Sequence, residues 1–153
     1  DIITFMNIDQ CVKTIEGQLT PARFQHSLGV MRSMQELAPI YQLEPGAAAL
    51  AGLVHDAGKE LSQIQMEDIA RRIGLSLECD EDRDPLFLHG PVSAYVAEHY
   101  LGVDDPLVLE AIFRHPYMGE GPAASPEFCW CLRFADLWSQ GVAGMKPVSA
   151  WDR

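Results

Sequence analysis

The stretch AGLVHDAGK at residues 51–59 decides the fold, because a strongly apolar run ends here in an adjacent histidine and aspartate. A helix over about 45–57 is apolar on nearly every side, and such a helix is normally the central one of a globular domain. A carboxylate at the end of a buried helix costs several kcal/mol unless a cation balances its charge. His55 and Asp56 are therefore candidate metal ligands at the centre of a helical domain.

The rest of the chain has the same helical character. Apolar residues recur three or four apart in most segments, and no segment alternates in the manner of a strand. We therefore predict an all-α fold, a single compact helical bundle over residues 1–153 with its core at about 20–140. The expected helices, many opened by proline and closed by glycine, cover residues 8–18, 21–41, 45–57, 63–73, 91–101, 106–114 and 126–140. The acidic segment 78–84 is expected to be a solvated loop, and Trp151 is expected to pack against the domain.

The composition argues against several classes of protein. A formal net charge of -11 leaves too few clustered basic residues for binding to duplex nucleic acid. The longest apolar runs have about eight residues, well below the roughly 20 that span a bilayer, and no signal-peptide pattern opens the sequence. We expect a cytoplasmic protein without duplex nucleic acid or membrane as partner. No CxxC spacing links the cysteines, which are expected to be buried or incidental thiols: Cys11, Cys79, Cys129 and Cys131.

Histidine and carboxylate side chains carry the chemistry of this sequence. Each of the five histidines, taken alone, is more often a structural residue than a ligand, but His55 and Asp56 form an adjacent pair. Imidazole nitrogen and carboxylate oxygen together suit ions such as iron, manganese and zinc. A divalent ion neutralises phosphate oxygens and lowers the pKa of bound water. Because the chain itself is acidic, such an ion also offsets the field that an anionic substrate meets.

The order of the histidines and aspartates along the chain is specific. Residues 55–59 read HDAGK, and further histidines and a late aspartate lie before and after them. This pattern resembles the HD superfamily of metal-dependent phosphohydrolases, whose signature is HDxGK. The blocks RFQHSLGV, AGLVHD, LHGPVSA and EAIFRH, at residues 23–30, 51–56, 88–94 and 110–115, are similar to successive blocks of the YqeK-like subgroup. That subgroup hydrolyses diadenosine tetraphosphate symmetrically to two ADP, and the resemblance covers about residues 20–140.

The resemblance implies an HD-domain helical bundle with a pair of metal ions, bridged by one carboxylate and by a hydroxide that attacks phosphorus. The implied ligands of one ion are His26, His55, Asp56 and Asp136, and those of the other are Asp56, His89 and His115. Asp56 and Lys59 are the implied catalytic residues, and Lys59 and Arg23 are the implied substrate-binding residues. For Arg23 a salt bridge to a nearby acid is an equal alternative. His99 has no counterpart in the pattern and is expected to be structural, near the end of its helix.

Two segments differ from the subgroup. Residues 116–121 read PYMGEG where the subgroup has Thr-Thr-Gly-Arg, and residues 137–140 read LWSQ where it has Tyr-Ile-Glu-Pro. The metal ligands are therefore present, whereas the residues that contact the substrate differ. Tyr117, Met118 and Trp138 either form a stacking surface for a base or belong to the core.

The sequence therefore favours a metal-dependent phosphohydrolase of a nucleotide or dinucleoside polyphosphate, with diadenosine tetraphosphate as one candidate. A regulatory HD module that keeps its metal without turnover is the first alternative, and a di-iron oxygenase of the same fold is the second. The expected cofactor is one or two divalent metal ions, with iron first by resemblance and manganese, zinc and nickel open. The expected partner is a small phosphorylated substrate, and a homodimer is left open.

Overall fold

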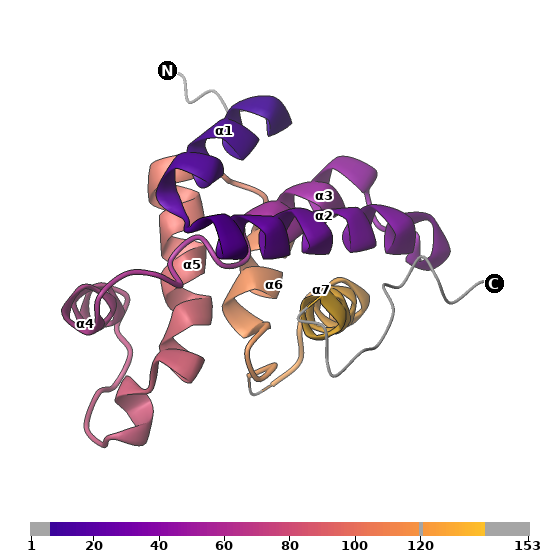
Figure 1. Ribbon diagram of the computed structural model, residues 1–153. Coiled ribbons are helices and arrows are strands. Elements are labelled where there is room, and N and C mark those ends of the chain that lie inside the picture. The colour runs from indigo at the N-terminus through magenta and orange to yellow at the C-terminus, as the bar shows by residue number, and fades with distance from the viewer. Residues whose placement is uncertain (1–6, 120, 140–153) are drawn as a thin grey trace.

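The computed structural model describes residues 7–119 and 121–139, and this part of the chain is helical throughout (Figure 1). The described helices are α1 (Ile8–Gln18), α2 (Pro21–Tyr41), α3 (Pro45–Val54), α4 (Gln63–Arg72), the short 3-10 helix η1 (Glu81–Arg83), α5 (Pro85–Leu101), α6 (Pro106–Arg114) and α7 (Pro126–Ser139). These residues contain no strand, which confirms the predicted all-α fold. None of the described helices combines the length and the hydrophobicity that crossing a bilayer requires.

Most helices begin where local chemistry in the sequence starts them. Proline occupies the first turn of α2, α3, α5 and α6, where its missing N–H costs no helical hydrogen bond. The residue before each proline accepts a hydrogen bond from a free N–H of that first turn: Thr20, Glu44, Asp84 and Asp105. Because these signals are local, α1, α2 and α6 have the bounds that the sequence predicts.

Helices α3 and α5 differ most from expectation, and α4 ends at Arg72 rather than at residue 73. α5 begins at Pro85 rather than Pro91, because Asp84 Oδ1 accepts a hydrogen bond from the Leu86 N–H at 2.9 Å and caps the helix there. Pro91 consequently lies inside α5. α3 ends at Val54, and turns follow over residues 55–60, so the predicted end at residue 57 was wrong. The acidic segment 78–84 contains η1 within its loop, and Trp151 lies outside the described residues.

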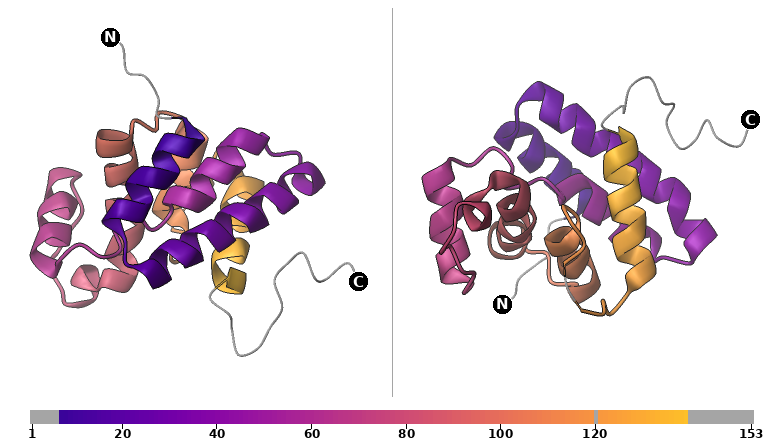
Figure 2. Two further views of the ribbon diagram at one scale, coloured as in Figure 1. Left: turned by 45° about the horizontal axis from the view of Figure 1, so that its top comes forward. Right: turned by 90° about the horizontal axis from the view of Figure 1, so that it is seen from below.

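Helices α2 and α3 lie side by side in every view, and α3 also packs against α1, α6 and α7 (Figures 1 and 2). Gly52 of α3 permits this packing, since a Cβ atom there would lie 2.7 Å from the backbone nitrogen and Cα of Met31. Helix α7 packs against α2, and α6 packs against both α5 and α7. Within the described residues the four cysteines form no disulfide, and all except Cys79 are buried. This arrangement brings the ends of several helices to one interior point.

Candidate metal centre

Six side chains from separate elements meet inside the bundle. Their sources are α2 for His26, the turn after α3 for His55 and Asp56, α5 for His89, the end of α6 for His115 and α7 for Asp136. Their potential ligand atoms form two groups, each within 4.8 Å, and all of these residues except His26 are buried. The fold therefore brings together every residue that the sequence predicts as a ligand.

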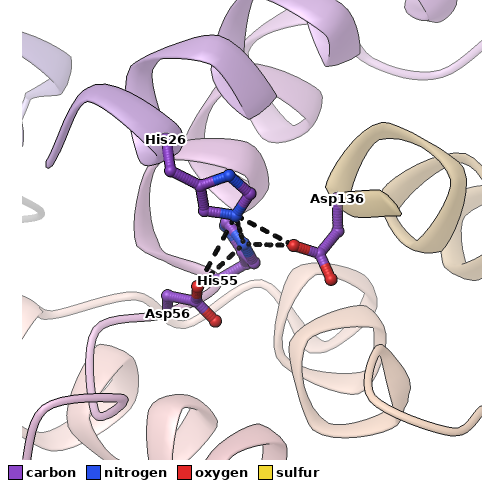
Figure 3. A group of neighbouring side chains, drawn as sticks. All are labelled: His26, His55, Asp56 and Asp136. Atoms are coloured by element: carbon purple, nitrogen blue, oxygen red, sulfur yellow. Dashed lines mark hydrogen bonds and ion pairs between the residues drawn. The ribbon is translucent and has the colours of Figure 1, made fainter. Parts of the chain in front are cut away.

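The first group joins His26, His55, Asp56 and Asp136 (Figure 3). Oδ1 of Asp136 lies 2.9 Å from Nε2 of His26 and 3.1 Å from Nε2 of His55. The two Nε2 atoms are 3.2 Å apart, and Oδ2 of Asp56 lies 3.6 Å and 3.4 Å from them respectively. Four potential ligand atoms therefore surround one point, as a metal site requires.

The second group joins Asp56, His89 and His115. The Nε2 atoms of the two histidines are 3.1 Å apart, and Oδ1 of Asp56 lies 3.7 Å from His89 and 3.4 Å from His115. Asp56 thus directs Oδ2 to the first group and Oδ1 to the second. One carboxylate lies between the two groups in the manner of a bridging ligand.

Backbone carbonyls fix the orientation of three of these imidazole rings. Nδ1 of His55 lies 2.7 Å from the Gly52 carbonyl oxygen. The Nδ1 atoms of His89 and His115 lie 3.0 Å and 2.6 Å from the carbonyl oxygens of Pro85 and Ile112. A carbonyl oxygen can only accept, so each Nδ1 donates its hydrogen, and in the neutral ring Nε2 then presents a lone pair to the centre. This backbone contact is the usual support of a metal-binding histidine.

The same contacts leave charges and lone pairs that a cation would satisfy. Oδ1 of Asp56 is buried and accepts no hydrogen bond in the part of the chain that the structure describes. Because both Nδ1 atoms donate to backbone carbonyls, the Nε2 atoms of His89 and His115, 3.1 Å apart, are the ring atoms that a cation between them would contact. A buried acceptor without a partner costs about 1–3 kcal/mol, and more when it is charged. The donor set therefore fits divalent metal ions of the kind that bind nitrogen and oxygen.

The electrostatics of the centre have the same origin. Burial lowers the pKa of His55, but the charge of Asp56 and a hydrogen bond to Asp136 outweigh burial and raise this pKa to about 10. Burial raises the pKa of both aspartates, yet the neighbouring histidines outweigh it and hold both carboxyl pKa values well below their usual range. Burial, followed by the charge of His115, lowers the pKa of His89 to about 4. His89 is therefore neutral near pH 7, as a metal ligand must be.

Arg23 and His99, two other basic residues that the sequence singles out, differ in their relation to the centre. Nη1 of Arg23 lies 3.4 Å from Oδ2 of Asp56. Arg23 therefore forms a salt bridge, as the alternative from the sequence predicted, and the acid that it pairs with is a candidate metal ligand. His99 is exposed beside Glu98, with its ring 4.2 Å from that of Tyr95. His99 lies outside both groups.

Lys59 follows in the turn after the ligand pair and is partly buried. Burial and the charge of His115 lower the pKa of His89 most, the charge of Asp56 raises it, and the charge of Lys59 lowers it further. Lys59 therefore belongs to the surroundings of the second group.

Two supporting contacts were not expected from the sequence. Oγ of Ser93 accepts a hydrogen bond from the Gly58 N–H at 2.9 Å, which ties the turn carrying Asp56 to α5. Nη1 of Arg133 donates to the His115 carbonyl oxygen at 3.0 Å. The paired residues are separated by 35 and 18 positions, so no local pattern in the sequence signals either contact.

The segment that departs from the subgroup is held by Arg114. Nη1 of Arg114 donates to the carbonyl oxygens of Met118 and Gly121 at 3.0 Å and 3.1 Å. Tyr117 is exposed and packs edge-on against Phe87, with ring centroids 5.2 Å apart. Trp138 is buried and belongs to the core, so it does not form the stacking surface considered from the sequence. Glu120 lies outside the described residues.

Comparison with known proteins assigns this arrangement to a family. The model of the HD domain family matches residues 23–141, which include all six candidate ligands. The chain belongs to the HD domain family.

Relatives of this HD domain include two named hydrolases. The symmetrical bis(5'-nucleosyl)-tetraphosphatase of Bacillus subtilis is 32% identical over 110 residues, which are 72% of this chain and 59% of that protein. The enzyme of the same name from Staphylococcus aureus is 34% identical over 110 residues, 72% of this chain and 56% of that protein. The chain therefore spans less than two thirds of the length of either relative.

A solved structure shares the fold. The crystal structure of a predicted HD superfamily hydrolase involved in NAD metabolism, from Clostridium acetobutylicum, has a TM-score of 0.79 and 30% sequence identity. The match covers 90% of this chain and 71% of that chain. The compact HD-type helical bundle predicted from the sequence is thereby confirmed.

Proposed function

We propose that this protein is a metal-dependent phosphohydrolase whose substrate is a nucleotide or a dinucleoside polyphosphate. The metal ligands would be His26, His55, Asp56, His89, His115 and Asp136. The two tetraphosphatases that resemble the chain support hydrolysis of a phosphoric anhydride, and diadenosine tetraphosphate is the first compound to test.

The observation that carries this proposal is the position of Asp56 between the two groups. Its Oδ2 lies 3.4 Å from Nε2 of His55, and its Oδ1 lies 3.4 Å from Nε2 of His115. Asp56 would supply one oxygen to a cation in each group, and divalent ions held there would act as Lewis acids toward a phosphate. Because Oδ1 has no hydrogen-bond donor among the described residues, a structural role leaves this buried oxygen unexplained.

Divalent ions bound here would neutralise phosphate oxygens and make hydroxide available near neutral pH. The chain's own residues would bind and orient the substrate. Arg23 borders the first group and its side chain is 31% exposed, so its guanidinium can donate to a phosphate oxygen beside Asp56. Lys59 lies in the turn after the ligand pair and adds a second positive charge. These residues would offset the net charge of -11 where an anionic substrate binds.

The proposal is tested by metal content and turnover on the same sample. Protein purified without chelator would be assayed for iron, manganese, zinc and nickel, and screened with dinucleoside polyphosphates, mononucleotides and a chromogenic phosphodiester. We expect about two metal equivalents and phosphate-containing products. Metal without turnover on any phosphate compound would favour the regulatory module. Product formation that depends on oxygen would favour the oxygenase instead, and absence of metal would refute the ligand set.

Variants separate a catalytic from a structural metal. Asp56→Asn should abolish turnover and lower metal content, because it removes the shared charge. Lys59→Met should keep both ions and reduce kcat about 10²–10³-fold, the usual cost of one electrostatic stabiliser. His99→Ala is the control, since His99 is exposed and lies outside both groups. A Lys59→Met variant as active as the His99→Ala variant would exclude Lys59 from catalysis.

A further inference from the structure

Arg133 is connected to both metal groups through a single helix. It lies on α7 one turn before Asp136, which belongs to the first group. Its side chain crosses to the end of α6, where Nη1 donates a hydrogen bond to the His115 carbonyl oxygen at 3.0 Å. His115 belongs to the second group. Helix α7 therefore supplies a candidate ligand to one group and a hydrogen bond to a candidate ligand of the other.

His115 needs such a contact because it is the residue at which α6 ends. The last carbonyls of a helix have no partner within the helix, and the backbone there is held only by what lies around it. The His115 ring is fixed through Nδ1 to the Ile112 carbonyl oxygen, a contact within its own helix end. Arg133 adds a hydrogen bond that links the backbone of His115 to another helix.

We propose that Arg133 is a positioning residue for the second metal ion, acting through His115. The inference rests on the proposed pair of ions and concerns only the ion that Asp56, His89 and His115 would hold. Without Arg133, the end of α6 loses its hydrogen bond to α7, and Nε2 of His115 is no longer held at 3.1 Å from Nε2 of His89. The first group has no ligand on α6, so we expect its affinity to depend much less on this contact.

The expected effect is selective for one ion. Loss of an outer hydrogen bond to a metal ligand typically weakens metal binding about 10–100-fold. We expect Arg133→Met to weaken binding of the second ion by this factor. The affinity for the first ion should stay within about three-fold of that of the unaltered chain. Arg133→Lys should recover most of the lost affinity, because its ammonium group can still donate to the carbonyl of His115.

The experiment is a titration of the metal-free full chain with cobalt(II), followed by visible absorption. The first group offers four ligand atoms and the second three, so two binding steps are expected. Arg83→Met is the matched control, because Nε of Arg83 also donates to a backbone carbonyl, that of Leu77, at 2.9 Å and outside both groups. A thermal melt of each variant establishes that it is folded. If the Arg133→Met variant does not fold, Arg133→Gln is used in its place. The glutamine side chain is polar but too short to donate to the His115 carbonyl oxygen.

Each outcome decides between stated alternatives. The inference is supported if Arg133→Met weakens only the second cobalt-binding step and Arg83→Met leaves both binding steps unchanged. Unchanged steps, or two steps weakened to the same degree, would overturn it and leave Arg133 as a structural contact. If the unaltered chain binds no second cobalt ion, the proposed pair of ions is itself wrong. That failure appears before any variant is titrated, so it is distinct from failure of the Arg133 inference alone.

Discussion

Replacing Gly52 with alanine should destabilise the protein, although alanine is the better helix former. Gly52 lies in α3 where that helix passes closest to α2. An added Cβ would lie 2.7 Å from both the nitrogen and Cα of Met31, and 2.8 Å from the Val30 carbonyl oxygen. All of these are backbone atoms of α2, so no side chain can rotate away, and the two helices must separate.

The magnitude follows from two opposing effects. Overpacking of a core typically costs about 1–3 kcal/mol, and a clash with backbone belongs at the upper end of this range. Alanine regains up to about 1 kcal/mol of helix propensity over glycine. We therefore expect a net loss of about 2 kcal/mol in the free energy of unfolding. For a chain of this length that corresponds to a melting temperature lower by about 4–8 °C.

The assay is urea unfolding and a thermal melt of metal-free protein, with Gly17→Ala as the matched control. Gly17 lies in α1, is exposed, and a Cβ there would meet nothing within 4 Å. The same substitution should therefore stabilise the protein slightly at Gly17 and destabilise it at Gly52. Because α2 carries His26 and α3 leads into His55, Gly52→Ala should also lower the affinity of the first group for a metal ion. Equal stability of the two variants would refute the argument from close packing.

Three further outcomes follow. Saturating metal at about 100 times its Kd should stabilise the folded chain by about 2.7 kcal/mol, and a chelator should reverse the rise in melting temperature. Ser93→Ala should cost about 1–3 kcal/mol in urea unfolding, because the buried Gly58 N–H loses its acceptor. Metal-free protein should lose stability as the pH falls from about 6.5 towards 4, because the unfolded chain binds a proton that His89, with its pKa lowered to about 4, does not take up. His89→Gln should flatten this dependence, and an unchanged slope in that variant would exclude His89 as its source.

Local signals in the sequence were enough to place the helices whose ends depend on neighbouring residues. Thr20 before Pro21, and Asp105 before Pro106, are start signals that tertiary packing does not alter. The same reasoning misplaced the start of α5, because Pro85 and Pro91 both fit the first turn of a helix. The Asp84 cap decides between them. The order of histidines and aspartates likewise indicated the family, since that order is a property of the chain alone.

Only the tertiary structure decided how these residues meet. Asp56 is adjacent to His55 in sequence, but its division between two groups depends on where α5, α6 and α7 place their side chains. The contact of Arg133 with His115 likewise requires α6 and α7 to pack in one register. Close contacts set the register between two helices. An example is the contact of Gly52 in α3 with Met31 in α2, two residues about twenty positions apart. Sequence spacing fixes which residues share a helix face, whereas the distance between faces follows from the packing of the whole core.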